Sequence, residues 1–228
     1  MIKKLIILTM SLFLILLTSC IGLRAEHNTS VPTDITALSP YQDKHDEASE
    51  MDSLIRALRF DEKHKRDTAK REILAISNKS QTARNYVIKE LLKIASVQNG
   101  RAELVSSSGR YYEWSEAVDI LGTIKVPEAL DVLIECLDCN DGAFGFSPNY
   151  FPAAVATIKI GEQSIPKLGQ ALGKDRRGIR YVAAQALYAI GGDKAKETLE
   201  KAMRKETDQD MASAMRDMLN NWDNSNKH

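Results

Sequence analysis

The sequence of 228 residues contains little of what enzymes and metal proteins commonly use. It has three cysteines, too few for a disulfide framework in a chain of this length, and four histidines, none of which lies between Lys65 and Lys227. A metal site needs a denser set of ligands, and a Ser-His-Asp arrangement needs a histidine near the serine. No glycine-rich phosphate loop and no Gly-x-Ser-x-Gly motif occurs. We therefore expect no catalysis and no metal or other cofactor.

An excess of charge of one sign is also missing, because 31 basic residues balance 31 acidic ones. Cleavage before Cys20 would remove Lys3 and Lys4 and leave 29 basic against 31 acidic residues. Proteins that bind nucleic acid usually carry a basic domain or stripe. We expect no nucleic-acid partner.

Only one long apolar run is present, "LIILTMSLFLILLT" from Leu5 to Thr18, preceded by the positively charged "MIKK". It is shorter than the roughly 20 apolar residues that a membrane-spanning helix needs. Its length and flanks are those of a secretory signal peptide. It ends in "LTSC", Leu17 to Cys20, which resembles the lipobox of bacterial lipoproteins.

That resemblance implies a signal peptide over residues 1–19, and a lipid on the Cys20 sulfur that anchors the chain to a membrane of the bacterial cell envelope. Two or more acyl chains give stable anchoring, whereas one gives only marginal binding. Residue 21 is Ile rather than Asp, which favours the outer membrane if the envelope is Gram-negative. The alternative is an uncleaved membrane anchor in which the cysteine occurs by chance.

Polar residues and two prolines fill residues 20–48, which we interpret as a flexible tether. Helical periodicity then begins, with Met51, Leu54 and Leu58 on one face, and no alternating strand pattern is convincing. Ser80 precedes another periodic segment and is expected to be its N-cap. We predict an all-helical domain over residues 49–223 and a disordered tail over 224–228.

Three segments of this domain resemble one another: "WSEAVDILGTIKVPEALDVLIECL", "YFPAAVATIKIGEQSIPKLGQAL" and "RYVAAQALYAIGGDKAKETLEKAM". Ala117, Ala153 and Ala183 correspond, at spacings of 36 and 30 residues. Each segment predicts an alanine-rich first helix, a short turn and a leucine-bearing second helix. Such helix pairs cannot bury their apolar faces alone and must stack.

This pattern resembles the HEAT-like repeats of the phycobilisome-lyase type, most clearly in "DRRGIRYVAAQALYAIG", where Asp175 and Arg180 occupy places that favour Asp and Arg. The resemblance covers residues 112–203, whereas residues 49–98 fit loosely, and Trp114 and Tyr150 replace Arg180 in the other copies. It implies a right-handed α-solenoid of stacked helix pairs whose second helices line a concave surface. Fold alone leaves the function open.

Cys136 and Cys139 form a Cys-x-x-Cys motif at the end of a predicted second helix. A redox motif of this kind normally opens a helix, where the dipole stabilises a thiolate. We interpret the pair as packing residues or a passive disulfide, with redox chemistry and metal binding as the alternatives.

Two features suggest a surface for a partner protein. Glu128, Asp131, Glu135 and Asp138 form an acidic row on one second helix, and the insertion "CNDGAFGFSPNYF" follows it with Phe144, Phe146, Tyr150 and Phe151. Insertions in repeat proteins map to loops near binding faces, and exposed aromatic residues are costly unless they contact something. The alternatives are a solvated row paired with neighbouring lysines and aromatic rings folded over the repeats.

The sequence therefore predicts a membrane-tethered scaffold that binds another envelope protein. The competing hypothesis is a lyase-like or thiol-active enzyme, or a ligand-handling protein, built on the same repeats.

Overall fold

A computed structural model of the chain describes residues 40–96, 108–140, 142 and 147–222. The described part is helical and contains no strand. Its α-helices are α2 (Pro40–Ala57), α3 (Lys63–Ser77), α4 (Gln81–Ala95), α6 (Ser108–Thr123), α7 (Leu130–Glu135), α8 (Pro152–Ile160), α9 (Ile165–Ala171), α10 (Arg177–Ile190), α11 (Gly192–Met203) and α12 (Gln209–Asn220). Three short 3₁₀ helices, η1 (Pro127–Ala129), η2 (Pro148–Tyr150) and η3 (Gly161–Ser164), precede α7, α8 and α9.

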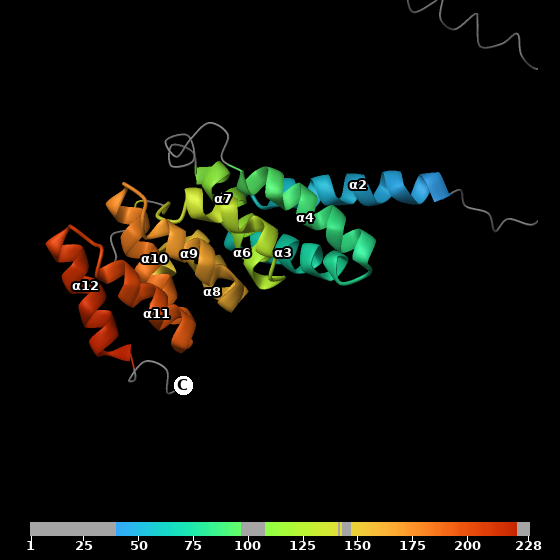
Figure 1. Ribbon diagram of the computed structural model, residues 1–228. Helices are drawn as coiled ribbons and strands as arrows, with labels where there is room; N and C mark the ends of the chain where they lie inside the picture. Colours follow the sequence, from blue (N-terminus) through green and yellow to red (C-terminus); the bar gives the residue numbers. More distant parts are fainter. Residues whose placement is uncertain (1–39, 97–107, 141, 143–146, 223–228) are drawn as a thin grey trace, which may run out of the picture. The chain divides into compact units, whose positions relative to one another are not determined.

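Consecutive helices pack in the order expected of stacked pairs (Figure 1). The first helices α6, α8, α10 and α12 contact one another in sequence, and so do the second helices α7, α9 and α11. At the other end α3 and α4 pack together and both contact α6. This packing confirms the prediction of an all-α solenoid.

The helix ends follow from local chemistry. Ser80 caps α4, as predicted, because its hydroxyl accepts a hydrogen bond from the backbone N–H of Ala83 at 3.1 Å. Pro152 opens α8 at a position where the missing N–H costs nothing. Gly161 and Gly191 end α8 and α10 with φ of 82° and 72°, a conformation that glycine adopts without strain.

The core is built from the predicted alanine and leucine rows. The alanines at 117, 153, 154, 156, 183, 184 and 186 are fully buried. Gly122 on α6 lies so close to α8 that a Cβ there would meet the Ala156 Cα at 2.6 Å. Small residues thus let the first helices approach closely, and the second helices contribute the buried Leu133, Leu168 and Leu199.

The helical part starts earlier than the predicted tether boundary at residue 48, because α2 already begins at Pro40. Proline suits the first turn of a helix, and the residues that follow are mostly polar helix formers, so no apolar periodicity marks this part of α2 in the sequence. The segments 1–19 and 224–228, the rest of the tether and Cys20 lie outside the described residues.

Residues 49–98 fit the repeat only loosely by sequence, but they contain the same type of arginine contact as the clearest repeat. Arg66 Nη1 donates to the carbonyls of Phe60 and Asp61 at 2.7 and 2.8 Å. Arg180 Nη1 donates to the carbonyls of Lys174 and Asp175 at 3.1 and 2.8 Å. The α2–α3 junction is therefore built like the α9–α10 junction, and the equal spacing of Asp61–Arg66 and Asp175–Arg180 was the sequence signal for it.

Candidate functional site

The second helices form a row whose register is set by one buried leucine each. Leu133 of α7, Leu168 of α9 and Leu199 of α11 are all at most 1% exposed. Residues at the same offset from these leucines occupy equivalent places in successive repeats. The charges that flank the leucines can therefore be compared from one repeat to the next.

Two ion pairs join α7 to α9 along this row. Asp131 pairs with Lys167 at 2.5 Å, and Glu135 pairs with Lys174 at 3.1 Å. Both carboxylates are about three-quarters exposed, at 76% and 73%. Exposed pairs of this kind contribute at most about 1 kcal/mol to stability. Two of the four acidic residues of the row are thus paired with lysines on and just after α9, as in the alternative interpretation of this row, and these two pairs are weak enough to exchange partners.

Asp138, predicted as the end of the exposed acidic row, is buried instead. The α-helix α7 ends at Glu135, and the turn that follows directs Asp138 inward to pair with Arg176 at 2.7 Å. Its carboxylate also lies beside Gly178 in the first turn of α10, so a Cβ there would require the Asp138 side chain to shift. The expected helical spacing was wrong here because the helix is shorter than its pattern.

Cys136 and Cys139 form a disulfide across this turn, and both are buried. The disulfide closes the turn that carries Asp138 toward α10. This agrees with the interpretation of the pair as structural residues. Among the described residues no cluster of His, Cys, Asp and Glu suitable for a metal ion is found.

The remaining predicted partner residues are not brought together into one patch. Glu128 is exposed and lies beside a separate groove along α4, with Lys89 and Lys93. Tyr150 is 45% exposed, whereas Phe151 is half-buried against the core. Phe144 and Phe146 lie outside the described residues.

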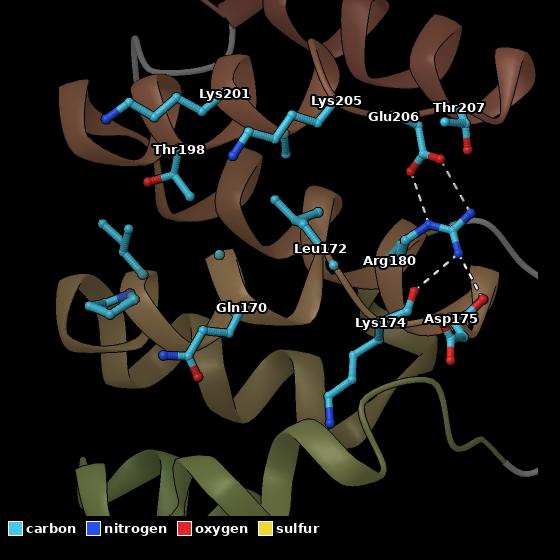
Figure 2. Close-up of a pocket in the computed structure, with 15 residues that line it drawn as sticks. Gln170, Leu172, Lys174, Asp175, Arg180, Thr198, Lys201, Lys205, Glu206 and Thr207 are labelled. Atoms are coloured by element: carbon cyan, nitrogen blue, oxygen red, sulfur yellow. Dashed lines mark hydrogen bonds and ion pairs between the residues drawn. The ribbon is translucent and has the colours of Figure 1, made fainter.

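A groove of 740 Å³ opens between α9 and α11 (Figure 2), and the sequence analysis did not find it. Leu172, Ile165, Pro166 and Ala202 supply its apolar surface. Gln170 and Lys174 come from the α9 side, and Lys201 and Lys205 come from the α11 side. Four basic side chains line the groove against two acidic ones.

Both of the acidic residues, Asp175 and Glu206, lie near Arg180 at one end of the groove (Figure 2). Arg180 Nε donates to Glu206 Oε2 at 2.9 Å, and the Glu206 side chain is only 6% exposed. Glu206 and Arg180 therefore offset each other, which leaves three lysines and the exposed Asp175 as the accessible charges of the groove, with Lys174 already paired with Glu135. The lining contains no histidine and no cysteine.

A second charged cluster lies on the first helices. Asp119 of α6 is paired with both Lys70 of α3 and Lys159 of α8, and Glu116 also pairs with Lys70, at 3.4 Å. Burial opposes ionisation of Asp119, but the hydrogen bonds from Lys159 and Lys70 outweigh it and lower the Asp119 pKa. Burial likewise disfavours charged Lys70, yet its bond to Asp119 raises the Lys70 pKa. This cluster joins three helices through ion pairs and so acts as a structural link between them.

Comparison with known proteins supports the repeat assignment. Residues 115–139 and 179–205 match the family model described as PBS lyase HEAT-like repeat. These segments contain α7 and most of α6, and α11 and most of α10, so the chain contains HEAT-like repeats at the positions where the helix pairs stack. No curated protein matches the chain. Within the described ranges, no helix has the length and apolar character needed to cross a membrane.

Proposed function

We propose that this protein is a lipid-anchored scaffold of the bacterial cell envelope that binds another envelope protein through its second-helix row and carries out no chemistry of its own. The observation that carries the proposal is the α9–α11 groove, whose lining combines an apolar floor with lysines. Apolar area and a rim of charge are what a protein partner requires. The HEAT-like repeats are consistent with a scaffold, because stacked repeats present extended binding surfaces.

Membrane attachment rests on the lipobox-like "LTSC" and the short apolar run before it. The Cys136–Cys139 disulfide supports export, since disulfides persist mainly in oxidising compartments outside the cytosol. The anchor at Cys20 would hold the repeats close to the membrane surface through the segment that precedes α2.

Metabolic labelling with palmitate tests the anchor. Label should enter the wild-type chain and be lost in Cys20→Ser. The double variant Cys136→Ser/Cys139→Ser is the matched control and should keep its label. Equal labelling of wild type and Cys20→Ser would exclude lipidation at Cys20.

Chemical cross-linking in intact envelopes, followed by purification of the full chain in detergent, tests the scaffold. The wild-type chain should yield a reproducible cross-linked envelope protein. If no such protein is recovered over a range of cross-linker lengths, the scaffold proposal fails, and the competing enzyme or ligand-handling hypothesis gains weight.

A further inference from the structure

The ion pairs Asp131–Lys167 and Glu135–Lys174 form a ladder between α7 and α9. The equivalent positions of α9 and α11 show where this ladder stops. Counting from the buried leucines, the positions of Asp131 and Glu135 on α7 are taken by Pro166 and Gln170 on α9. Neither of these two residues carries a charge. On the other side one of the two lysines is kept, since Lys205 stands in the place of Lys174, whereas Thr198 stands in the place of Lys167. At the Lys205 position the α9–α11 groove therefore has a cation of the ladder without its carboxylate.

Lys205 is exposed, and no carboxylate of the described residues pairs with it. Lys201 pairs with Glu197 on its own helix, at 2.6 Å, and both side chains are more than 60% exposed. Such a pair gives way at little cost to a stronger partner. The groove thus presents two lysines that are available to a negative group.

We propose that the α9–α11 groove docks an acidic segment of the partner protein, with a carboxylate of that segment placed between Gln170 and Lys205, as Glu135 is placed at Lys174. The partner segment thus supplies to Lys205 the carboxylate that Glu135 of this chain supplies to Lys174. This inference rests on the proposed scaffold function and names the site and the chemistry of its ligand.

The shape of the groove favours a peptide over a small anion. Its volume of 740 Å³ accommodates several side chains, and Leu172, Ile165 and Ala202 provide apolar surface beside the lysines. A peptide with an apolar residue next to an Asp or Glu uses both parts of the lining. A phosphate or a lipid headgroup uses only the lysines.

Two substitutions test the site from opposite sides. Lys205→Ala removes the cation, and Lys79→Ala is its control, an exposed lysine on the turn between α3 and α4. Gln170→Glu supplies the missing carboxylate in cis, so that it pairs with Lys205 and competes with the ligand. Gln163→Glu, an exposed residue of η3 outside the groove, makes the same chemical change as a control.

The probe is a displayed library of short random peptides, selected on the full chain in non-ionic detergent. Selected peptides should carry Asp or Glu beside an apolar residue. Resynthesised with a fluorescent label, they should bind Lys205→Ala and Gln170→Glu up to about fivefold more weakly than wild type at low salt, because one exposed charge pair is worth at most about 1 kcal/mol. Both control variants should bind like wild type, and added salt should weaken binding.

The inference is overturned if no peptide is selected, if the selected peptides lack acidic residues, or if Gln170→Glu binds as Gln163→Glu does. Vesicles containing phosphatidylglycerol are tested in parallel, and binding to them that depends on Lys205 would assign the groove to a phosphate headgroup and also overturn it. Cross-linking in envelopes separates this inference from the scaffold proposal. If Gln170→Glu cross-links to the envelope protein as wild type does, the groove is not the docking site but the scaffold proposal holds. If the wild type cross-links to no envelope protein, the scaffold proposal itself fails.

Discussion

Arg180 of α10 holds Glu206, which follows α11, by a hydrogen bond of 2.9 Å from Nε to Oε2, and the Glu206 side chain is 6% exposed. The same guanidinium satisfies the carbonyls of Lys174 and Asp175, which follow α9. One side chain therefore ties together the ends of two second helices and forms one end of the α9–α11 groove.

Arg180→Ala should lower the free energy of unfolding by about 3 kcal/mol, because it leaves a buried carboxylate without its counter-charge. Arg180→Lys should also lower the free energy of unfolding, since an ammonium cannot make the forked set of contacts that the guanidinium makes. Urea unfolding followed by circular dichroism measures both. Arg177→Ala is the control: its side chain is 57% exposed, and it should cost less than about 1 kcal/mol. Equal losses for the two arginines would contradict the role given to Arg180.

Asp119→Asn should destabilise the protein by about 1–2 kcal/mol at neutral pH, since two lysines lose their shared partner. The pKa of Asp119 is lowered in the folded protein from its ordinary value of 3.8. Its contribution is therefore complete above that value and is lost as the pH falls below it. The difference between wild type and Asp119→Asn in urea unfolding should shrink as the pH is lowered below 3.8. Glu72→Gln, on the exposed face of α3, should unfold like wild type at neutral pH.

Gly122→Ala should destabilise the protein by about 1–3 kcal/mol although alanine is the better helix former. The added Cβ would meet the backbone of Ala156 at 2.6 Å, so α6 and α8 must move apart. Gly173→Ala meets its nearest neighbour at 3.5 Å and should change the stability little. Thermal unfolding of the two variants compares them directly. A stabilised Gly122→Ala would show that the two helices are not in such close contact.

Replacing Cys136 and Cys139 together by Ala should cost about 1–2 kcal/mol through lost packing and the lost cross-link, and should leave localisation and partner capture intact. A reducing agent should lower the melting temperature of the wild type and leave that of the double variant unchanged. Loss of a thiol-dependent activity in the double variant would instead favour the redox alternative.

The helices and their repeat register were predictable from the sequence because their signals are local. Rows of alanine and leucine at helical spacing indicate which faces are buried, and Ser80 marks a helix start through a bond to a backbone N–H three residues away. The tether boundary was less predictable, since the first turns of α2 carry no apolar periodicity.

The sequence by itself thus determined the all-helical repeats, the buried rows and a cysteine placed as in a lipobox. Only the tertiary structure decided which charges meet between helices, because each of those pairs joins residues tens of positions apart in the sequence. Asp138 points inward and pairs with Arg176 because α7 ends at Glu135, and Glu135 pairs with Lys174, which follows α9. Among the described residues Lys205 has no such partner, because the facing helix carries Gln170 at the place where α7 carries Glu135. This relationship exists only once α9 and α11 lie side by side.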